Sequence, residues 1–143
     1  MIFADDETLL DACRREIDDL HLFFEAWLAG NLPATDEILS RLETALEPGF
    51  NLIGPDGRAR DRATVVDWIR DSHSRRPDLQ IWIENATLRW SDDSTTLVTY
   101  EEWQREGGSV NARQSTALFL NRSAAPNGLT WLHVHESWLE EPV

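Results

Sequence analysis

The hydrophobic pattern of the chain changes its period once, and this change constrains the fold more than any other feature. Over most of residues 6–76, apolar residues recur at spacings of three and four, which is typical of amphipathic helices. From Leu79 to Leu139, apolar and polar residues alternate instead, as in strands with one buried face. Helices followed by consecutive strands predict an α+β fold, with the helices on one face of the sheet.

Three helices are predicted in the first part of the chain. The first spans residues 6–29, and its apolar stripe includes Cys13, which we expect in the core. His21 falls beside this stripe and is expected to be exposed. Thr35 and Asp61 suit the N-caps of the second and third helices, because their side chains accept hydrogen bonds from free backbone N–H groups. Helix-breaking residues stop the three helices at Gly30 to Pro33, Pro48-Gly49 and Pro77.

Four long strands are predicted after the helices, and short polar turns join most of them, which favours antiparallel pairing. Long strands twist and coil, so the sheet should wrap around the helices into a cone whose mouth forms a pocket. With no repeat or linker, residues 1–143 are read as a single domain. With a short strand at 50–53, the sheet has about five strands, the long ones at 79–90, 95–105, 110–122 and 130–139.

The charge of the chain argues against some classes of partner. Asp and Glu total 26 and Lys and Arg total 13, so the net charge is −13. Nucleic acids and anionic membrane surfaces attract basic patches, so neither is expected to be a partner. No stretch is apolar enough to span a membrane, and the N-terminal residues lack the pattern of a secretion signal, so a cytoplasmic location is expected.

Several motifs together resemble the nuclear transport factor 2-like superfamily, within its SnoaL-like and calcium/calmodulin-dependent kinase II association-domain branch. They are FNLIGPDG at 50–57, TYEEWQ at 99–104, RQSTALF at 113–119 and the closing WLHVH at 131–135, and the second and third also match an uncharacterised bacterial subgroup. The resemblance covers residues 6–139. It implies a cone with three leading helices, a single SnoaL-like domain with a small-molecule pocket, and often a homodimer formed through the sheet.

The chain departs from the resemblance in its closing strand. Related strands often read H-x-H-x-S after the valine; here His135 fits the first histidine, but Ser137 and Leu139 stand at the next two positions. The Asp-His pair of the superfamily's dehydratases is not matched either. The resemblance therefore implies the fold and a pocket more strongly than any one reaction.

Two histidines in the last strand are the first candidates for chemistry. Alternation places Trp131, His133, His135 and Ser137 on one face, which we expect to line the cone. An imidazole titrates near neutral pH, so either histidine could be a general base or a substrate ligand. The alternatives are hydrogen-bonded sheet residues or a dimer interface. A metal site would need a third ligand such as Glu84, and no metal is expected.

Glu101 and Glu102 form the second candidate cluster. Neighbouring residues on a strand point to opposite faces, so only one of these glutamates can enter the cone. Arg113, on the next strand, is the expected cation beside it. The pair could be a structural bridge, or the acid could orient a histidine while Arg113 holds a substrate oxyanion.

Aromatic residues supply the expected apolar walls of the pocket: Trp27, Phe50, Trp68, Trp103, Phe119 and Trp131. Two functional hypotheses follow. The chain could be a cofactor-free acid–base enzyme, an isomerase, cyclase, dehydratase or hydrolase, acting on a small apolar or aromatic molecule. It could instead be a non-enzymatic ligand-binding or oligomerisation module whose buried polar groups satisfy one another.

Overall fold

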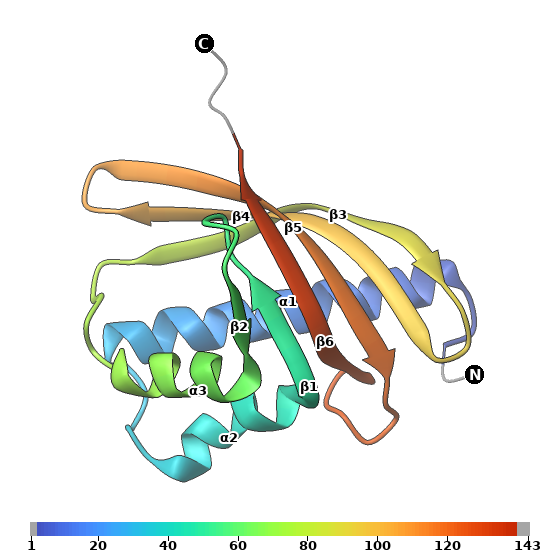
Figure 1. Cartoon of the computed structure of the whole chain (residues 1–143), viewed down its shortest axis with the longest axis horizontal. Helices are drawn as coiled ribbons and strands as arrows, with labels where there is room; N and C mark the ends of the chain where they lie inside the picture. Colours follow the sequence, from blue (N-terminus) through green and yellow to red (C-terminus); the bar gives the residue numbers. More distant parts are fainter. Residues whose placement is uncertain (1–2, 140–143) are drawn as a thin grey trace.

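The computed structural model describes residues 3–139 and confirms the predicted α+β class (Figure 1). The helices cover one face of a curved sheet, and the longest of them, α1, runs across its concave side (Figure 1). None of the helices in the described part is both long and apolar enough to cross a membrane. In chain order the elements are α1 (Asp6–Ala29), α2 (Asp36–Ala45), β1 (Leu46–Ile53), β2 (Ala59–Asp61), α3 (Arg62–Asp71), β3 (Gln80–Ser91), β4 (Thr95–Glu106), β5 (Ser109–Asn121) and β6 (Leu129–Trp138).

Within the described residues, the sheet has six strands in the order β2-β1-β6-β5-β4-β3, one more than predicted. Strands β3 to β6 form the predicted antiparallel meander, and β2 adds a short antiparallel partner to β1. One pairing departs from the predicted antiparallel sheet, because β1 pairs with β6 in parallel. The hairpin rule applies only to strands joined by tight turns, and these two strands are separated by most of the chain.

The helix ends follow the predicted capping chemistry. Thr35 accepts a hydrogen bond from the backbone N–H of Ile38 (3.3 Å), and Asp61 accepts one from that of Thr64 (2.9 Å). The end of α2 differs from the prediction. It stops at Ala45, and the Pro48-Gly49 pair lies within β1, where the pairing with β6 shifts its register. The chain therefore passes from helix to strand without an intervening loop.

The core fills the space between the helices and the concave face of the sheet. Cys13 is fully buried there, as predicted. Trp27 and Phe119 also belong to this core. The Trp27 indole N–H donates to the Ile69 carbonyl (2.7 Å), and the Phe119 ring centroid lies 4.5 Å from that of Trp131.

A β-bulge in β6 decides which side chains of this strand face the helices. Trp131 pairs with Phe119 and His133 pairs with Leu118, so Leu132 is an extra residue with no partner on β5. The bulge interrupts the alternation. As a result, Trp131 is buried on the concave side together with the later residues Val134 and Glu136.

The prediction that the His133/His135 face looks into the cone is therefore wrong. His135 is exposed and His133 is partly exposed, both on the sheet face that the helices leave uncovered. The His133 Nδ1 lies 2.7 Å from the Asn51 side-chain oxygen, and the two imidazole centroids are 6.4 Å apart. The predicted grouping of Trp131 with these histidines fails for the same reason, because the alternation rule assumes a strand without an extra residue.

Candidate functional site

A cavity of about 130 Å³ opens between the helical layer and the concave face of the sheet. Its wall is mainly apolar, and three of the predicted aromatic wall residues, Phe50, Trp68 and Trp131, contribute to it. Trp68 is 58% exposed, so it lies where the cavity meets solvent. The polar side chains of the wall are His21, Arg76, Tyr100, Glu102, Gln104, Arg113 and Glu136.

Other predicted site residues lie away from the cavity. Trp27 and Phe119 are core residues, and Trp103 stacks against Trp82, with ring centroids 6.0 Å apart, on the uncovered face of the sheet. Glu101 shares that face, where it accepts hydrogen bonds from Asn85 and from the Trp103 indole N–H. The predicted site residues His133, His135 and Glu101 are therefore not among the residues that line this cavity.

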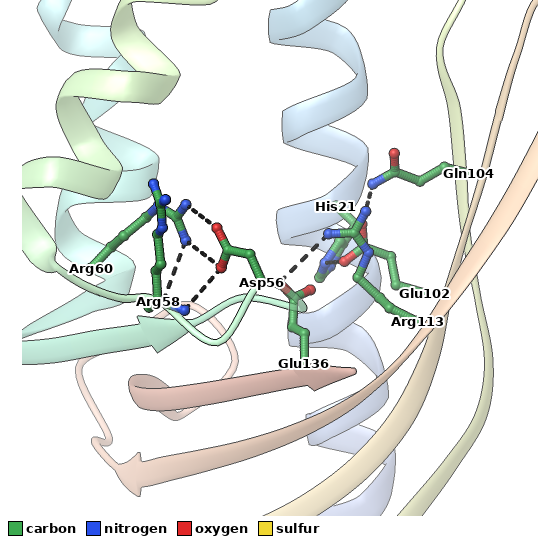
Figure 2. Close-up of polar contacts among 8 residues, drawn as sticks. All are labelled: His21, Asp56, Arg58, Arg60, Glu102, Gln104, Arg113 and Glu136. Carbon is green, nitrogen blue, oxygen red and sulfur yellow. Dashed lines mark hydrogen bonds and ion pairs between the residues drawn. The ribbon is translucent and has the colours of Figure 1, made fainter. Parts of the chain in front are cut away.

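Glu102 is the glutamate that enters the cone, as alternation required of one of the pair. It lies opposite Arg113 in the β4–β5 register, which confirms the predicted neighbourhood of acid and cation. Figure 2 shows both side chains in one group with His21, Gln104 and Glu136. The Glu102 carboxylate accepts from the Gln104 amide (2.6 Å) and lies 3.0 Å from His21 Nε2.

His21 is a site residue that the sequence prediction missed, and the prediction that it is exposed is wrong. It is 6% exposed, because the buried face of α1 is wider than the stripe of apolar residues suggested. Its Nδ1 lies 2.7 Å from the Ile17 carbonyl and its Nε2 lies 3.0 Å from the Glu102 carboxylate. A carbonyl and an ionised carboxylate only accept hydrogen bonds, so both ring nitrogens donate and His21 is an imidazolium.

The His21–Glu102 pair shifts both pKa values toward the charged forms. Burial lowers the pKa of His21, but the charge of Glu102 and the two hydrogen bonds raise it above its usual value. Burial raises the pKa of Glu102, and the imidazolium of His21, with Arg113, more than offsets this and lowers it to about 2. The pair is therefore a buried ion pair at neutral pH.

Glu136, on β6, is the second missed residue and behaves in the opposite way. Burial and the negative charge of Glu102 raise its pKa to about 7, although Arg113 and His21 oppose the rise. The nearest Arg113 nitrogen is 3.6 Å from the Glu136 carboxylate, so the two charges attract without a short hydrogen bond. Glu136 is thus the carboxyl group of the cavity that exchanges its proton near neutral pH.

Two carboxyl groups with pKa values pushed far apart allow different chemical roles in one site. Glu102 remains an anion that holds His21 in place, and Glu136 can donate or accept a proton. Arg113 adds a fixed positive charge beside Glu136. The indole of Trp138 covers the guanidinium at 4.8 Å, which shields it from water. Within residues 3–139, no group of three or more His, Cys, Asp or Glu residues is arranged to hold a metal ion.

Known structures share this fold. An NTF2-like protein of unknown function from Pseudomonas aeruginosa superposes with a TM-score of 0.82 and 26% identity, covering 90% of this chain and 99% of that one. The S. rosetta calcium/calmodulin-dependent kinase II hub has a TM-score of 0.60 and 16% identity, covering 74% of this chain and 92% of that one. These similarities confirm the predicted nuclear transport factor 2-like fold.

The proteins that are similar in sequence are longer than this chain, and the similarity covers only part of each. Sucrose-phosphatase 1 of Nicotiana tabacum is 27% identical over 128 residues, which are 87% of this chain and 30% of that protein. Probable sucrose-phosphatase 3a of Arabidopsis thaliana is 27% identical over 131 residues, which are 88% of this chain and 30% of that protein. The chain thus spans about 30% of the length of these relatives. The model of the family described as sucrose-6-phosphate phosphohydrolase C-terminal matches residues 13–140. Because this match covers most of the chain, the protein belongs to the sucrose-6-phosphate phosphohydrolase C-terminal family, with a nuclear transport factor 2-like fold.

Proposed function

We propose that the protein binds a small organic molecule in the cavity, with the apolar body of the ligand against the aromatic wall and its polar group beside Arg113 and Glu136. One observation carries this proposal: a mainly apolar cavity wall surrounds a small set of polar side chains, among which His21, Glu102, Arg113 and Glu136 form a largely buried charged group. Binding sites for small molecules commonly combine an apolar wall with a few polar groups that fix the orientation of the ligand.

The size of the cavity limits the ligand. An apolar protein cavity of roughly 150 Å³ holds a molecule the size of benzene. The present cavity, at about 130 Å³, accommodates a single small ring or a short branched chain with one polar group. A disaccharide phosphate, the substrate class suggested by the names of the relatives, is larger and carries hydroxyl groups on every side, so it matches this cavity poorly.

A second function is acid–base catalysis on the bound molecule. The observation that favours it is the separation of the two carboxyl groups, since Glu136 has a pKa of about 7 and Glu102 one of about 2. A group that titrates near the working pH is suited to general acid–base catalysis. In this case Glu136 carries the proton, Arg113 stabilises a developing oxyanion, and no cofactor is needed. This role replaces the one predicted for His133 and His135.

Binding is tested with a panel of single-ring and short-chain compounds. We expect some of them to change the fluorescence of Trp68 and Trp131 and to raise the melting temperature of the protein, because they bind only the folded state. Val134→Phe should fill part of the cavity and weaken this binding, whereas His135→Ala, on the opposite face of the same strand, should leave it unchanged.

The test has a clear negative outcome. If no compound binds the wild type, or if binding survives in Val134→Phe and in a second filling variant, Leu52→Phe, the cavity is not the binding site. Circular dichroism must first show that the filling variants are folded. Catalysis is tested separately, because Glu136→Gln should abolish turnover of a substrate while leaving its binding measurable.

A further inference from the structure

We infer that the polar group of the ligand is a carboxylate, and that it binds together with one proton taken up by Glu136. This inference rests on the proposed binding function and adds the chemical class of the ligand. It is argued from the charges, hydrogen bonds and free donors of the buried cluster His21, Glu102, Arg113 and Glu136 (Figure 2).

The charges of the cluster are fixed except at one residue. His21 donates from both ring nitrogens and is positive, Arg113 is positive, and Glu102 is negative. When Glu136 is protonated, the cluster therefore carries one net positive charge. When Glu136 is ionised, the cluster is neutral. A ligand with one negative charge is balanced only by the protonated form.

Arg113 has the free donors that such a ligand requires. Its side chain is 17% exposed, and within residues 3–139 its buried Nε atom has no hydrogen-bond partner, while Nη1 lies 3.6 Å from the Glu136 carboxylate. A buried N–H group without an acceptor is unfavourable, because it has lost water and gained no hydrogen bond in exchange. A carboxylate matches the planar fork of a guanidinium and accepts two parallel hydrogen bonds from it. The unpaired Nε and the long Nη1 contact thus favour a carboxylate, which can accept from two guanidinium N–H groups, over a hydroxyl group, which can accept from only one.

The groups around Glu136 explain why it should take up a proton when the ligand binds. It is faced by His21 from α1, Tyr100 and Glu102 from β4, Arg113 from β5 and, at longer range, Arg60 from β2. Arg60 itself pairs with Asp56 in the β1–β2 hairpin (2.8 Å), on the opposite side of Figure 2, which partly neutralises it. A ligand carboxylate at Arg113 adds a second negative charge near Glu136 and competes for its cation. Both effects favour the protonated form of Glu136, so binding takes up a proton.

The experiment compares three probes of similar shape: benzoate, benzamide and benzyl alcohol. We expect benzoate to bind most tightly near pH 6, and its affinity to fall about tenfold per pH unit above the range where Glu136 loses its proton. The affinities of benzamide and benzyl alcohol should change little. Calorimetry of benzoate binding near pH 7.5, in phosphate and in Tris, should show different heats because the buffer supplies the proton.

Two variants locate the effect. Glu136→Gln should still bind benzoate but lose both the buffer-dependent heat and the pH dependence. Arg113→Gln should weaken benzoate about tenfold or more, because the charged hydrogen bonds are lost, and weaken benzamide less. His135→Ala, on the uncovered face, serves as the matched control and should behave like the wild type.

Each outcome decides something different. If benzamide or benzyl alcohol binds as tightly as benzoate at pH 6, the carboxylate inference fails while the binding function stands. If benzoate binds without proton uptake, the role of Glu136 fails. If phenyl phosphate binds more tightly than benzoate, the ligand class is a phosphate and the inference is wrong. If neither these probes nor any other compound binds, the proposed function itself fails.

Discussion

Folding holds Glu136 in its protonated form, and this has a measurable effect on stability. Its pKa rises from the usual 4.5 to about 7, so between these pH values the folded protein keeps a proton that the unfolded chain releases. The stability contribution of this group is therefore fully present below about pH 4.5 and is lost as the pH rises toward 7. At neutral pH and above, the ionised Glu136 destabilises the fold, because its charge is buried in the cavity near that of Glu102.

Glu136→Gln should remove this pH dependence, because an amide does not ionise. We compare the free energy of unfolding of the variant with that of the wild type. This difference should shift in favour of the variant by about 3 kcal/mol between pH 4.5 and pH 8. Urea unfolding at three pH values measures it, with Glu84→Gln, an exposed glutamate, as the control. Parallel stability curves for the variant and the wild type would contradict the raised pKa.

Glu102→Gln should lower the stability of the fold at neutral pH, whereas Glu136→Gln should raise it. It leaves the His21 imidazolium buried without its counter-charge, and breaking such a pair costs roughly 3–5 kcal/mol. Because the pKa of Glu102 is depressed to about 2, its contribution is present above about pH 4.5 and is lost as the pH falls toward 2.

The adjacent residue provides the control for this second prediction. Glu101→Gln changes the same side chain on the uncovered face and should cost less than about 1 kcal/mol. Thermal unfolding at pH 7 compares the two variants. Equal losses would show that the His21–Glu102 pair adds no more than an exposed contact.

At the scale of single elements, the end of α1 depends on a glycine. Gly30 has φ of 80°, in the left-handed region, and its N–H and that of Asn31 donate to carbonyls of the last helical turn. A Cβ at this position would also collide with the Ser74 side chain. The helix end is therefore fixed both by the backbone angle and by the close approach of the segment after α3.

Three glycine variants separate these two effects. Gly57 has φ of 79°, whereas Gly49 has no positive φ, and a Cβ added at either would meet no atom of residues 3–139 within 4 Å. We expect Gly49→Ala to be neutral or slightly stabilising, Gly57→Ala to cost about 1 kcal/mol, and Gly30→Ala to cost clearly more. Chemical denaturation gives the three values, and similar losses at Gly30 and Gly57 would exclude the steric contribution of Ser74.

At the scale of the whole molecule, none of the helices within residues 3–139 covers the convex face of the sheet (Figure 1). Thr116, Leu118, His133 and His135 lie next to one another there, across β5 and β6. We propose that a second copy of the chain packs on this face to form a homodimer. The partly apolar, partly polar character of the face is compatible with such an interface.

Leu118→Arg tests this proposal, because it would place an unpaired charge in the centre of the interface. We expect sedimentation analysis to show a dimer for the wild type and mainly monomer for the variant. Leu22→Arg changes an exposed leucine on α1 and should leave the dimer intact. A monomeric wild type, or a dimeric Leu118→Arg, would exclude this face as the interface.

The sequence by itself determined the element order apart from β2, the caps at Thr35 and Asp61, the antiparallel meander and the entry of one glutamate, beside Arg113, into the cone. These features depend on local hydrogen bonds and on periods of a few residues, which the sequence displays directly. They were therefore predicted together with the fold class.

The tertiary structure decided which side chains meet in the cavity. The bulge at Leu132 moved His133 and His135 to the uncovered face, and the curvature of the sheet over α1 buried His21 beside Glu102. Glu136 lies in the same cavity, where burial and the negative charge of Glu102 raise its pKa. Bulges and burial depend on the register of strands that lie far apart in the sequence. The local period of apolar residues does not predict this register.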